Sequence, residues 1–277
     1  RTVHYVAPTV WAWRAGRAEK MAKVIDHVLA LFPFEPPYME AAGMECDFVG
    51  HPVVAEPVAS MEDAREFRQH HELGNAPIML VLPGSRGGEV NRLAPVFGES
   101  LIAFLADYPD MKVVIPTVGT VTNLVREAVR DWPITPLILD PRGMNNELYA
   151  IEKRSAFRAA NIALAASGTV SLELAAAQTP MVIAYDMSWI SRQIIARMLK
   201  VDTVTLVNLV SETRAVPEFI GAACKPADIA KGLGAVMSNR DAQLAAMAET
   251  MQRLGADGEA PGLRAARAVL TGMKTRQ

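Results

Sequence analysis

Residues 81–89 read Val-Leu-Pro-Gly-Ser-Arg-Gly-Gly-Glu, an apolar segment that runs directly into a glycine-rich turn. The apolar run starts at Ile78, so it predicts a strand over 78–82, and the apolar spacing beyond the turn predicts a helix over 93–108. A strand, a tight turn and a helix in this order form a βα unit, which belongs in a parallel sheet.

The same alternation of short apolar and longer amphipathic segments continues along the chain. It predicts an α/β fold with a doubly wound parallel sheet. Strand-like runs over 3–6 and 28–32 precede this series and predict the closing part of another such domain, joined through a proline-containing hinge near 52–57. Further strands are expected at 113–115, 138–139, 162–166 and 181–185, and later helices at 188–200, 227–237, 241–254 and 262–271.

Composition narrows the class of protein. Hydrophobic residues make up 51% and charged residues 21% of the 277 residues, as in a globular protein. The formal net charge is −2 with scattered Lys and Arg, which argues against a nucleic-acid partner. Cys46 and Cys224 are far apart in the sequence, and neither has a second ligand at the spacing of a metal site. They are therefore predicted to be free thiols in a reducing compartment. No apolar run reaches the roughly 18 residues of a membrane span, so we expect a cytoplasmic location.

The turn at Gly84, Ser85 and Arg86 has the chemistry of an anion site. Glycine lets the backbone approach a ligand, and the N–H groups at a helix start attract negative charge. Arg86 adds a permanent charge whose fork geometry suits phosphate oxygens. The pattern matches neither a P-loop nor a G-x-G-x-x-G fingerprint. The alternative is a tight turn with Arg86 in a surface salt bridge.

A second turn of this kind occupies residues 165–174, Ala-Ala-Ser-Gly-Thr-Val-Ser-Leu-Glu-Leu. Ser167, Gly168 and Thr169 follow a small-residue strand and open a helix, where their N–H and hydroxyl groups can donate to a phosphate. Glu173 lies about one turn further, where its carboxylate can accept the hydroxyls of a ribose. Helix capping and the helix dipole would explain the same residues without a ligand.

Two anion-binding turns in one sheet favour a nucleotide diphosphate, which needs a phosphate cradle and a ribose acceptor. The chain contains no Asp-x-Asp pair, so we predict no metal. Arg86 and the helix termini would then have to stabilise the leaving diphosphate.

Other candidates are individually weaker. Asn208 stands in an apolar run and is either a core amide or a ligand contact. Trp11 and Arg14 lie in a loop after a strand, where they could bind a sugar, an acyl chain or a phosphate, or anchor the loop. His51 could be a base, but a hinge residue that bonds to backbone is favoured. The segment 189–200 could rest on an anionic membrane, but core packing is favoured, because its spacing is the ordinary amphipathic pattern.

Five segments in register indicate a family. They lie at 6–14, 31–35, 49–52, 82–86 and 166–169. The chain resembles the lipid-A-disaccharide synthase family over essentially its full length. The resemblance implies the glycosyltransferase-B fold, with two Rossmann-like domains. It also implies that Ser85, Arg86, Ser167, Gly168, Thr169, Glu173 and Asn208 are nucleotide-side positions.

The resemblance implies inverting transfer of 2,3-diacylglucosamine from UDP to the 6-hydroxyl of 2,3-diacylglucosamine 1-phosphate. Lipid A disaccharide 1-phosphate and UDP would be the products, with no cofactor. Arg86 would support catalysis, and the general base would lie upstream of this chain. The implied location is the cytoplasmic face of the inner membrane, with peripheral contact. Both a monomer and a homo-oligomer are compatible with the resemblance.

The expected domains follow from the same comparison. Residues 1–50 would be the end of a largely missing N-terminal acceptor domain with the hinge, 51–255 the nucleotide-sugar domain, and 256–277 a helix returning to the N-terminal domain. The chain starts inside a strand-like segment without Met, which we interpret as a fragment, inactive alone. Two departures from the family pattern are Ala55-Glu56, where an Asp is usual, and Asp186, where a basic residue is typical. A UDP-sugar epimerase or hydrolase of the same fold, or a non-catalytic UDP-sugar-binding module, are the alternatives.

Overall fold

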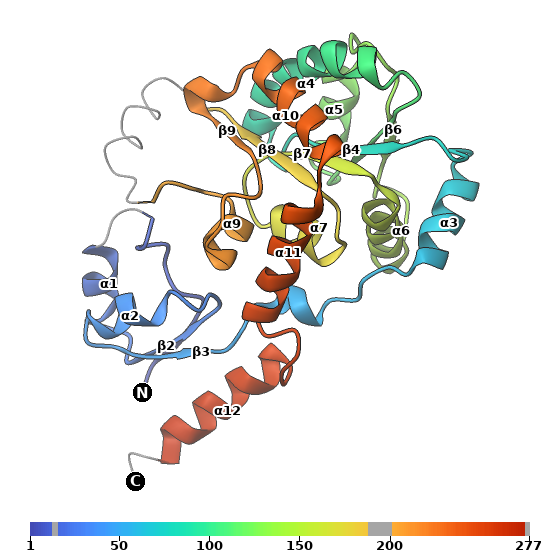
Figure 1. Cartoon of the computed structure of the whole chain (residues 1–277). Coiled ribbons are helices and arrows are strands. Elements are labelled where there is room, and N and C mark those ends of the chain that lie inside the picture. The colour runs from blue at the N-terminus through green and yellow to red at the C-terminus, as the bar shows by residue number, and fades with distance from the viewer. Residues whose placement is uncertain (13–15, 188–200, 275–277) are drawn as a thin grey trace.

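The computed structural model describes residues 1–12, 16–187 and 201–274 as an α/β protein with two parallel sheets (Figure 1). The larger sheet has six strands in the order β6-β5-β4-β7-β8-β9, and the smaller one has the order β1-β2-β3. The larger sheet comprises β4 (Ile78–Leu82), β5 (Lys112–Pro116), β6 (Leu137–Leu139), β7 (Ile162–Ala165), β8 (Met181–Tyr185) and β9 (Glu218–Ile220). The smaller sheet comprises β1 (Val3–Tyr5), β2 (His27–Ala30) and β3 (Glu45–Phe48).

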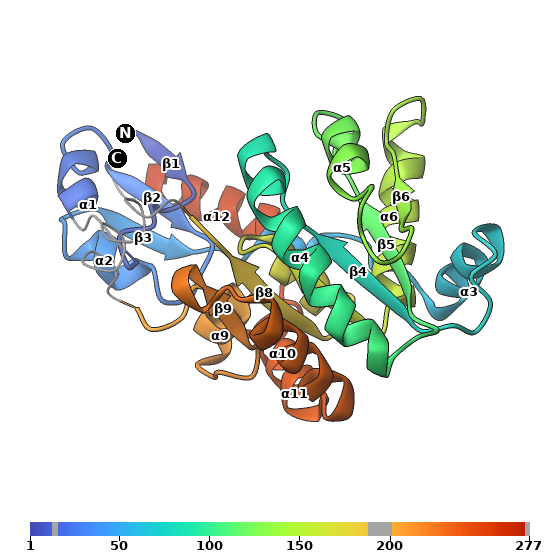
Figure 2. The same ribbon diagram turned by 90° about the horizontal axis from the view of Figure 1, so that it is seen from above.

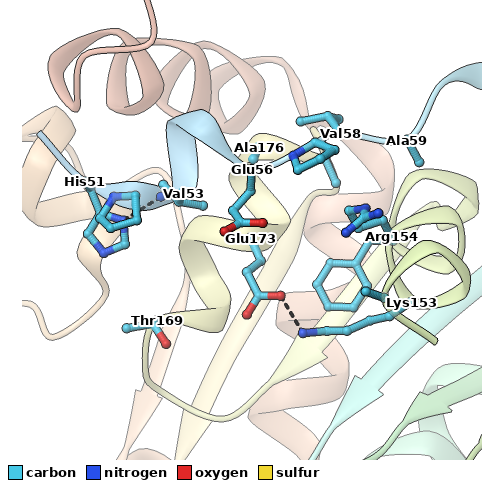
Figure 3. Close-up of a pocket in the computed structure, with 15 residues that line it drawn as sticks. His51, Val53, Glu56, Val58, Ala59, Lys153, Arg154, Thr169, Glu173 and Ala176 are labelled. Carbon is cyan, nitrogen blue, oxygen red and sulfur yellow. Dashed lines mark hydrogen bonds and ion pairs between the residues drawn. The ribbon is translucent and has the colours of Figure 1, made fainter. Parts of the chain in front are cut away.

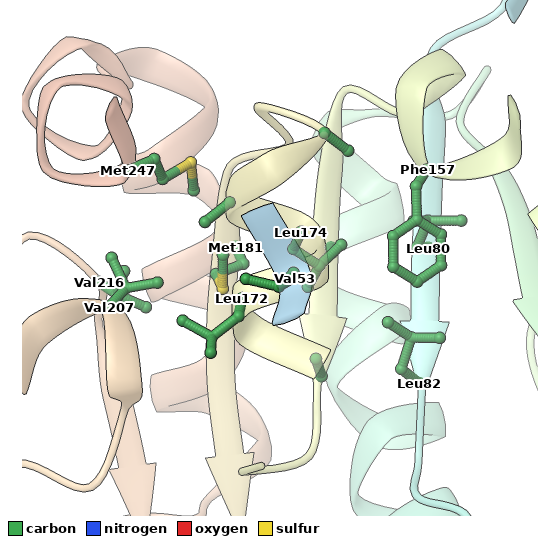
Figure 4. Close-up of a cluster of buried hydrophobic side chains, with 14 of the residues drawn as sticks. Val53, Leu80, Leu82, Phe157, Leu172, Leu174, Met181, Val207, Val216 and Met247 are labelled. Carbon is green, nitrogen blue, oxygen red and sulfur yellow. The ribbon is translucent and has the colours of Figure 1, made fainter. Parts of the chain in front are cut away.

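Helices cover both faces of the six-stranded sheet, because alternate residues of its buried strands point to opposite sides. In β4, Ile78, Leu80 and Leu82 face one core, whereas Met79 and Val81 face the other. The first core, shown in part in Figure 4, is covered by α3 (Met61–His70), α6 (Asn146–Ala159), α7 (Val170–Ala176), α9 (Leu206–Ser211) and α11 (Asp241–Arg253). The second is covered by α4 (Gly87–Asp107), α5 (Thr122–Ala128) and α10 (Pro226–Ser238).

The three-stranded sheet has a small core of its own. It packs with α1 (Gly16–Met21) and α2 (Pro36–Glu40). The last helix, α12 (Pro261–Lys274), lies beside this sheet although it is far away in sequence (Figure 2). Arg264 Nη2 donates to the Phe48 carbonyl at 2.8 Å, and the Arg1 side chain bonds to the Gly272 carbonyl. The two ends of the chain are thereby held together.

The segment between the sheets is fixed at Gly50. This residue has a φ of +88°, and a Cβ there would lie 2.8 Å from the Leu254 carbonyl oxygen. Glycine is therefore required both for the backbone conformation and for the close approach. The His51 N–H donates to the same carbonyl at 3.3 Å, and η1, a 3₁₀ helix over Pro52–Ala55, follows directly.

Several boundaries differ from the sequence prediction. The expected helix at 93–108 spans Gly87–Asp107 instead, because Glu89 accepts from N–H groups at its start and the glycine-rich turn runs directly into the helix. Strands β3 and β9 were not predicted, since both are short and neither is fully buried. The predicted helix at 188–200 lies outside the described residues.

Replacing Phe97 by Ala should lower the free energy of unfolding by about 3–5 kcal/mol, because it leaves a cavity under α4. Phe97 is completely buried in the second core. Ile102→Ala on the same helix is the matched control, since Ile102 is 62% exposed, and it should change stability by less than about 0.5 kcal/mol. Urea unfolding measures both values, and equal losses would contradict the described packing.

Candidate functional site

The two predicted turns come together because their strands are neighbours. β4 pairs with β7 in parallel, with Leu82 opposite Ala165, so both strands end at the same edge of the sheet. The turn at Gly84–Arg86 follows β4, and the turn at Ser167–Thr169 follows β7. Ligands of open α/β sheets bind beyond this carboxyl edge. The arrangement therefore brings the expected anion-binding groups to the same edge of the sheet, on neighbouring strands.

The turn after β4 differs from the expected open anion site. The backbone N–H groups of Ser85 and Arg86 donate to Glu89 Oε2 at 3.0 and 3.3 Å. Glu89 Oε1 also accepts from Arg86 Nη1 at 2.9 Å. An internal carboxylate thus occupies the N–H groups that we expected to face a ligand. What the turn presents outward is the Arg86 side chain, which is 82% exposed.

The turn after β7 is more open. Gly168 has a φ of +152°, which favours glycine, and Thr169 precedes α7. Within the described residues, the Thr169 hydroxyl makes no capping bond to α7, so simple capping does not account for that side chain. Gly168 and Thr169 are both exposed. Their polar groups are therefore accessible to a ligand.

A cleft of about 460 Å³ begins at this second turn (Figure 3). Thr169 and Glu173 line one side, residues 51–59 cover the cleft, and α6 closes the other side. The lining is mostly apolar and includes Phe157, and four charged side chains also line the cleft. The charged residues are Glu56, Lys153, Arg154 and Glu173. A mostly apolar cleft with a few polar groups is the usual form of a small-molecule site.

Glu173, the predicted ribose acceptor, is already paired in the cleft. Lys153 Nζ on α6 lies 2.5 Å from Glu173 Oε2, as the dashed line in Figure 3 marks. The same ammonium lies 5.2 Å from the centroid of the Phe157 ring, within the range of a cation–π contact. Both partners are partly exposed, so the pair is screened by water and contributes little to stability. The bond from Lys153 instead holds the Glu173 carboxylate in one orientation.

His51 bonds to the backbone, which is the interaction expected of it in the hinge interpretation. Its Nδ1 accepts from the Val53 N–H at 3.1 Å, which caps η1, and its ring packs near Phe32. Burial lowers the pKa of His51. Because Nδ1 is an acceptor, the neutral imidazole carries its proton on Nε2. His51 also lines the cleft, so this N–H is a polar group near the second turn.

The remaining predicted residues lie elsewhere. Asn208 is 1% exposed, donates to the Val216 carbonyl at 2.9 Å and accepts from the Val216 N–H at 3.0 Å. These are the partners of a core amide, so we leave Asn208 out of the candidate contacts. Trp11 is buried and packs edge-on against Phe34 at 5.1 Å, which favours a loop anchor. Arg14 lies outside the described residues.

Two residues near the site were not assigned roles from the sequence. Glu89 belongs to the first motif, and its position three residues after the helix cap was the available signal. Lys153 had no such signal, because its contact with Glu173 joins two helices.

A cluster of potential metal ligands lies outside the cleft. His70, His71 and Glu152 place one ligand atom each within 4.8 Å of one another, the single such group among the described residues. His71 Nε2 lies 2.9 Å from Glu152 Oε1, so a hydrogen bond between the residue that follows α3 and a residue of α6 accounts for this pair.

No helix among residues 1–12, 16–187 and 201–274 is both long enough and apolar enough to cross a bilayer.

Sequence comparison identifies related proteins. Residues 1–269 match the profile of the family described as lipid-A-disaccharide synthetase. The lipid-A-disaccharide synthase of Ruegeria pomeroyi is 64% identical over 98% of this chain and 67% of its own length. That of Rhodospirillum centenum is 46% identical over 97% of this chain and 66% of its own length. The chain spans about two thirds of these curated relatives.

Solved structures support the fold. The chain is similar to UDP-GlcNAc 2-epimerase from Neisseria meningitidis bound to UDP-GlcNAc, with a TM-score of 0.57 and 14% identity, over 91% of this chain and 62% of that one. Anabaena HepE in complex with UDP and glucose gives a TM-score of 0.52 and 12% identity, over 98% of this chain and 72% of that one. At these identities the likeness concerns the fold alone, which is the glycosyltransferase-B type that was predicted.

A buried carboxyl beside Trp11 provides a pH-dependent test. Glu35 is 2% exposed, and its Oε2 accepts from the Leu31 and Phe32 N–H groups at 3.0 Å each. Burial raises its pKa from 4.5 to about 7, against the opposing effect of these hydrogen bonds. The folded state therefore favours the protonated form, and this contribution to stability is lost as the pH rises from 4.5 to about 7.

Glu35→Gln should remove that pH dependence, because the amide does not ionise. The stability of the unchanged protein relative to the variant should fall by up to about 3 kcal/mol over this interval. Urea unfolding between pH 4.5 and 8 measures the difference. A difference that stays constant with pH would show that the Glu35 pKa is not raised.

Proposed function

Since the chain belongs to the lipid-A-disaccharide synthase family, we propose that it carries the nucleotide-sugar half of an inverting glycosyltransferase. The reaction moves 2,3-diacylglucosamine from UDP to the 6-hydroxyl of 2,3-diacylglucosamine 1-phosphate and releases UDP. The observation that carries the proposal is the convergence of the two turns at the carboxyl edge, next to a cleft of about 460 Å³.

UDP is proposed to span the turns and the cleft. Its diphosphate lies between Arg86 and the turn at Ser167–Thr169, where N–H groups at the start of α7 and the Thr169 hydroxyl can donate. Its ribose reaches Glu173, and its base enters the mostly apolar part of the cleft under residues 56–59. The support for this placement is that Thr169 and Glu173 line one continuous cleft.

Arg86 is proposed to stabilise the departing diphosphate. Its guanidinium offers five N–H donors, and the bond to Glu89 uses one edge of the fork. The outer edge can meet two phosphate oxygens as negative charge develops on the leaving group. Deprotonation of the acceptor hydroxyl is assigned to no residue of this chain; a carboxylate would serve that purpose.

Contact with the cytoplasmic face of the inner membrane is part of the proposal, because both substrates carry acyl chains. An epimerase or hydrolase is less well supported: the epimerase structure is 14% identical, whereas the synthase from Ruegeria pomeroyi is 64% identical. Fold alone does not separate these activities.

Arg86→Ala in the complete protein should weaken UDP binding by about 10–100-fold, as expected for loss of a charge-assisted hydrogen bond. The turnover of both lipid substrates should fall with it. Arg92→Ala is the matched control, because Arg92 is an exposed residue on the same helix. Calorimetry with UDP and mass spectrometry of the products measure the two effects. Unchanged affinity and turnover would contradict the placement of the diphosphate.

Glu173→Gln should weaken UDP binding by about tenfold, because the amide offers the ribose hydroxyls a weaker acceptor than a carboxylate. The loss should be much smaller for a 2′,3′-dideoxy analogue of UDP, which lacks both hydroxyls. Glu66→Gln, on the exposed face of α3, is the control. Equal losses for UDP and the analogue would argue against a ribose contact at Glu173.

A further inference from the structure

Glu89 holds Arg86 at two points. Glu89 Oε2 accepts from the Ser85 and Arg86 backbone N–H groups, and Oε1 accepts from Arg86 Nη1 at 2.9 Å. One carboxylate thus fixes both the backbone of the turn and the first edge of the guanidinium. Bonds of this kind between a carboxylate and charged or backbone donors are directional and comparatively strong.

The turn is shaped to admit this carboxylate. Gly84 has a φ of +115°, and a Cβ at that position would lie 2.5 Å from both Cβ and Oε2 of Glu89. A side chain at residue 84 would therefore displace Glu89. The Glu89 side chain is only 17% exposed, whereas that of Arg86 is 82% exposed. Glu89 lies within the turn, and Arg86 extends from it toward solvent.

We propose that Glu89 is a positioning residue that aims Arg86 at the diphosphate of the nucleotide sugar. The proposal rests on the function assigned to Arg86 above. Glu89 does not touch the ligand; it restricts the rotamers of a long side chain that would otherwise lose much conformational freedom on binding. Because the ion pair engages Nη1, the remaining donors stay available to phosphate oxygens. The N–H groups of the turn then bond to Glu89, and the Arg86 side chain binds the diphosphate.

A double-mutant cycle in the complete protein tests this role. Glu89→Ala and Glu89→Gln are each made alone and together with Arg86→Ala, and binding of UDP and uridine is measured by calorimetry. Glu89→Ala should weaken UDP binding about tenfold when Arg86 is present and less than about twofold when Arg86 is absent. Uridine binding should not change, because uridine has no phosphate.

Glu89→Gln is the conservative variant. Its amide oxygen can still accept from both N–H groups of the turn, so it should recover most of the UDP affinity that Glu89→Ala loses. Thermal unfolding of each variant reports the contribution of Glu89 to the start of α4. If Glu89→Ala does not fold, Glu89→Gln provides the test. Its smaller loss of UDP affinity must disappear when Arg86 is also replaced by Ala.

Two results would overturn the proposal. If Glu89→Ala weakens UDP binding equally with and without Arg86, Glu89 is a helix cap alone. If it strengthens UDP binding, the carboxylate competes with the diphosphate for the same donors. Failure of the proposed function has a different signature, since Arg86→Ala alone would then leave UDP affinity unchanged.

Discussion

The parallel pairing of β4 with β7 is the contact on which the site depends. Along the chain, Leu82 and Ala165 are far apart, yet they lie opposite each other, and the Ala166 N–H donates to the Leu82 carbonyl at 2.8 Å. This register makes both strands end together, so the two turns that follow them share one edge. Since the strands are buried on both faces, a slip by one residue would reverse every core side chain. The core therefore sets the relative position of Arg86 and Thr169.

The cleft depends on a second constraint, the path of residues 50–59. The close approach of Gly50 to the Leu254 carbonyl anchors this segment to the end of α11. From there His51 caps η1, and residues 56–59 pass over α6 and α7. The segment that joins the two sheets is thus also a wall of the cleft. A change in its path would alter the space beside Glu173 without touching the sheet.

The sequence predicted what periodicity and local chemistry control. Strand β4 was predicted with its observed bounds, and the turn glycines Gly84 and Gly168 have the positive φ that such turns use. Contacts between distant segments were not predictable. Lys153 lies in an ordinary amphipathic helix, and its partner Glu173 lies on another helix. Asn208 bonds to the backbone of Val216, which lies beyond the end of α9. The bonds from the N–H groups at 85 and 86 to Glu89 are local instead, and the position of Glu89 three residues after the helix cap was a signal that the prediction missed.

Each charged group proposed to meet UDP is already paired with an opposite charge. Arg86 is held by Glu89, and Glu173 by Lys153. In both pairs the recorded bond uses one side of the functional group: Nη1 of the guanidinium, and Oε2 of the carboxylate. The Arg86 side chain is 82% exposed and that of Glu173 is 43% exposed, so a ligand can reach both groups while the pairs stay intact. Pairing therefore lowers the cost of orienting long side chains while leaving them able to bind, and Lys153 gains a second support from the Phe157 ring.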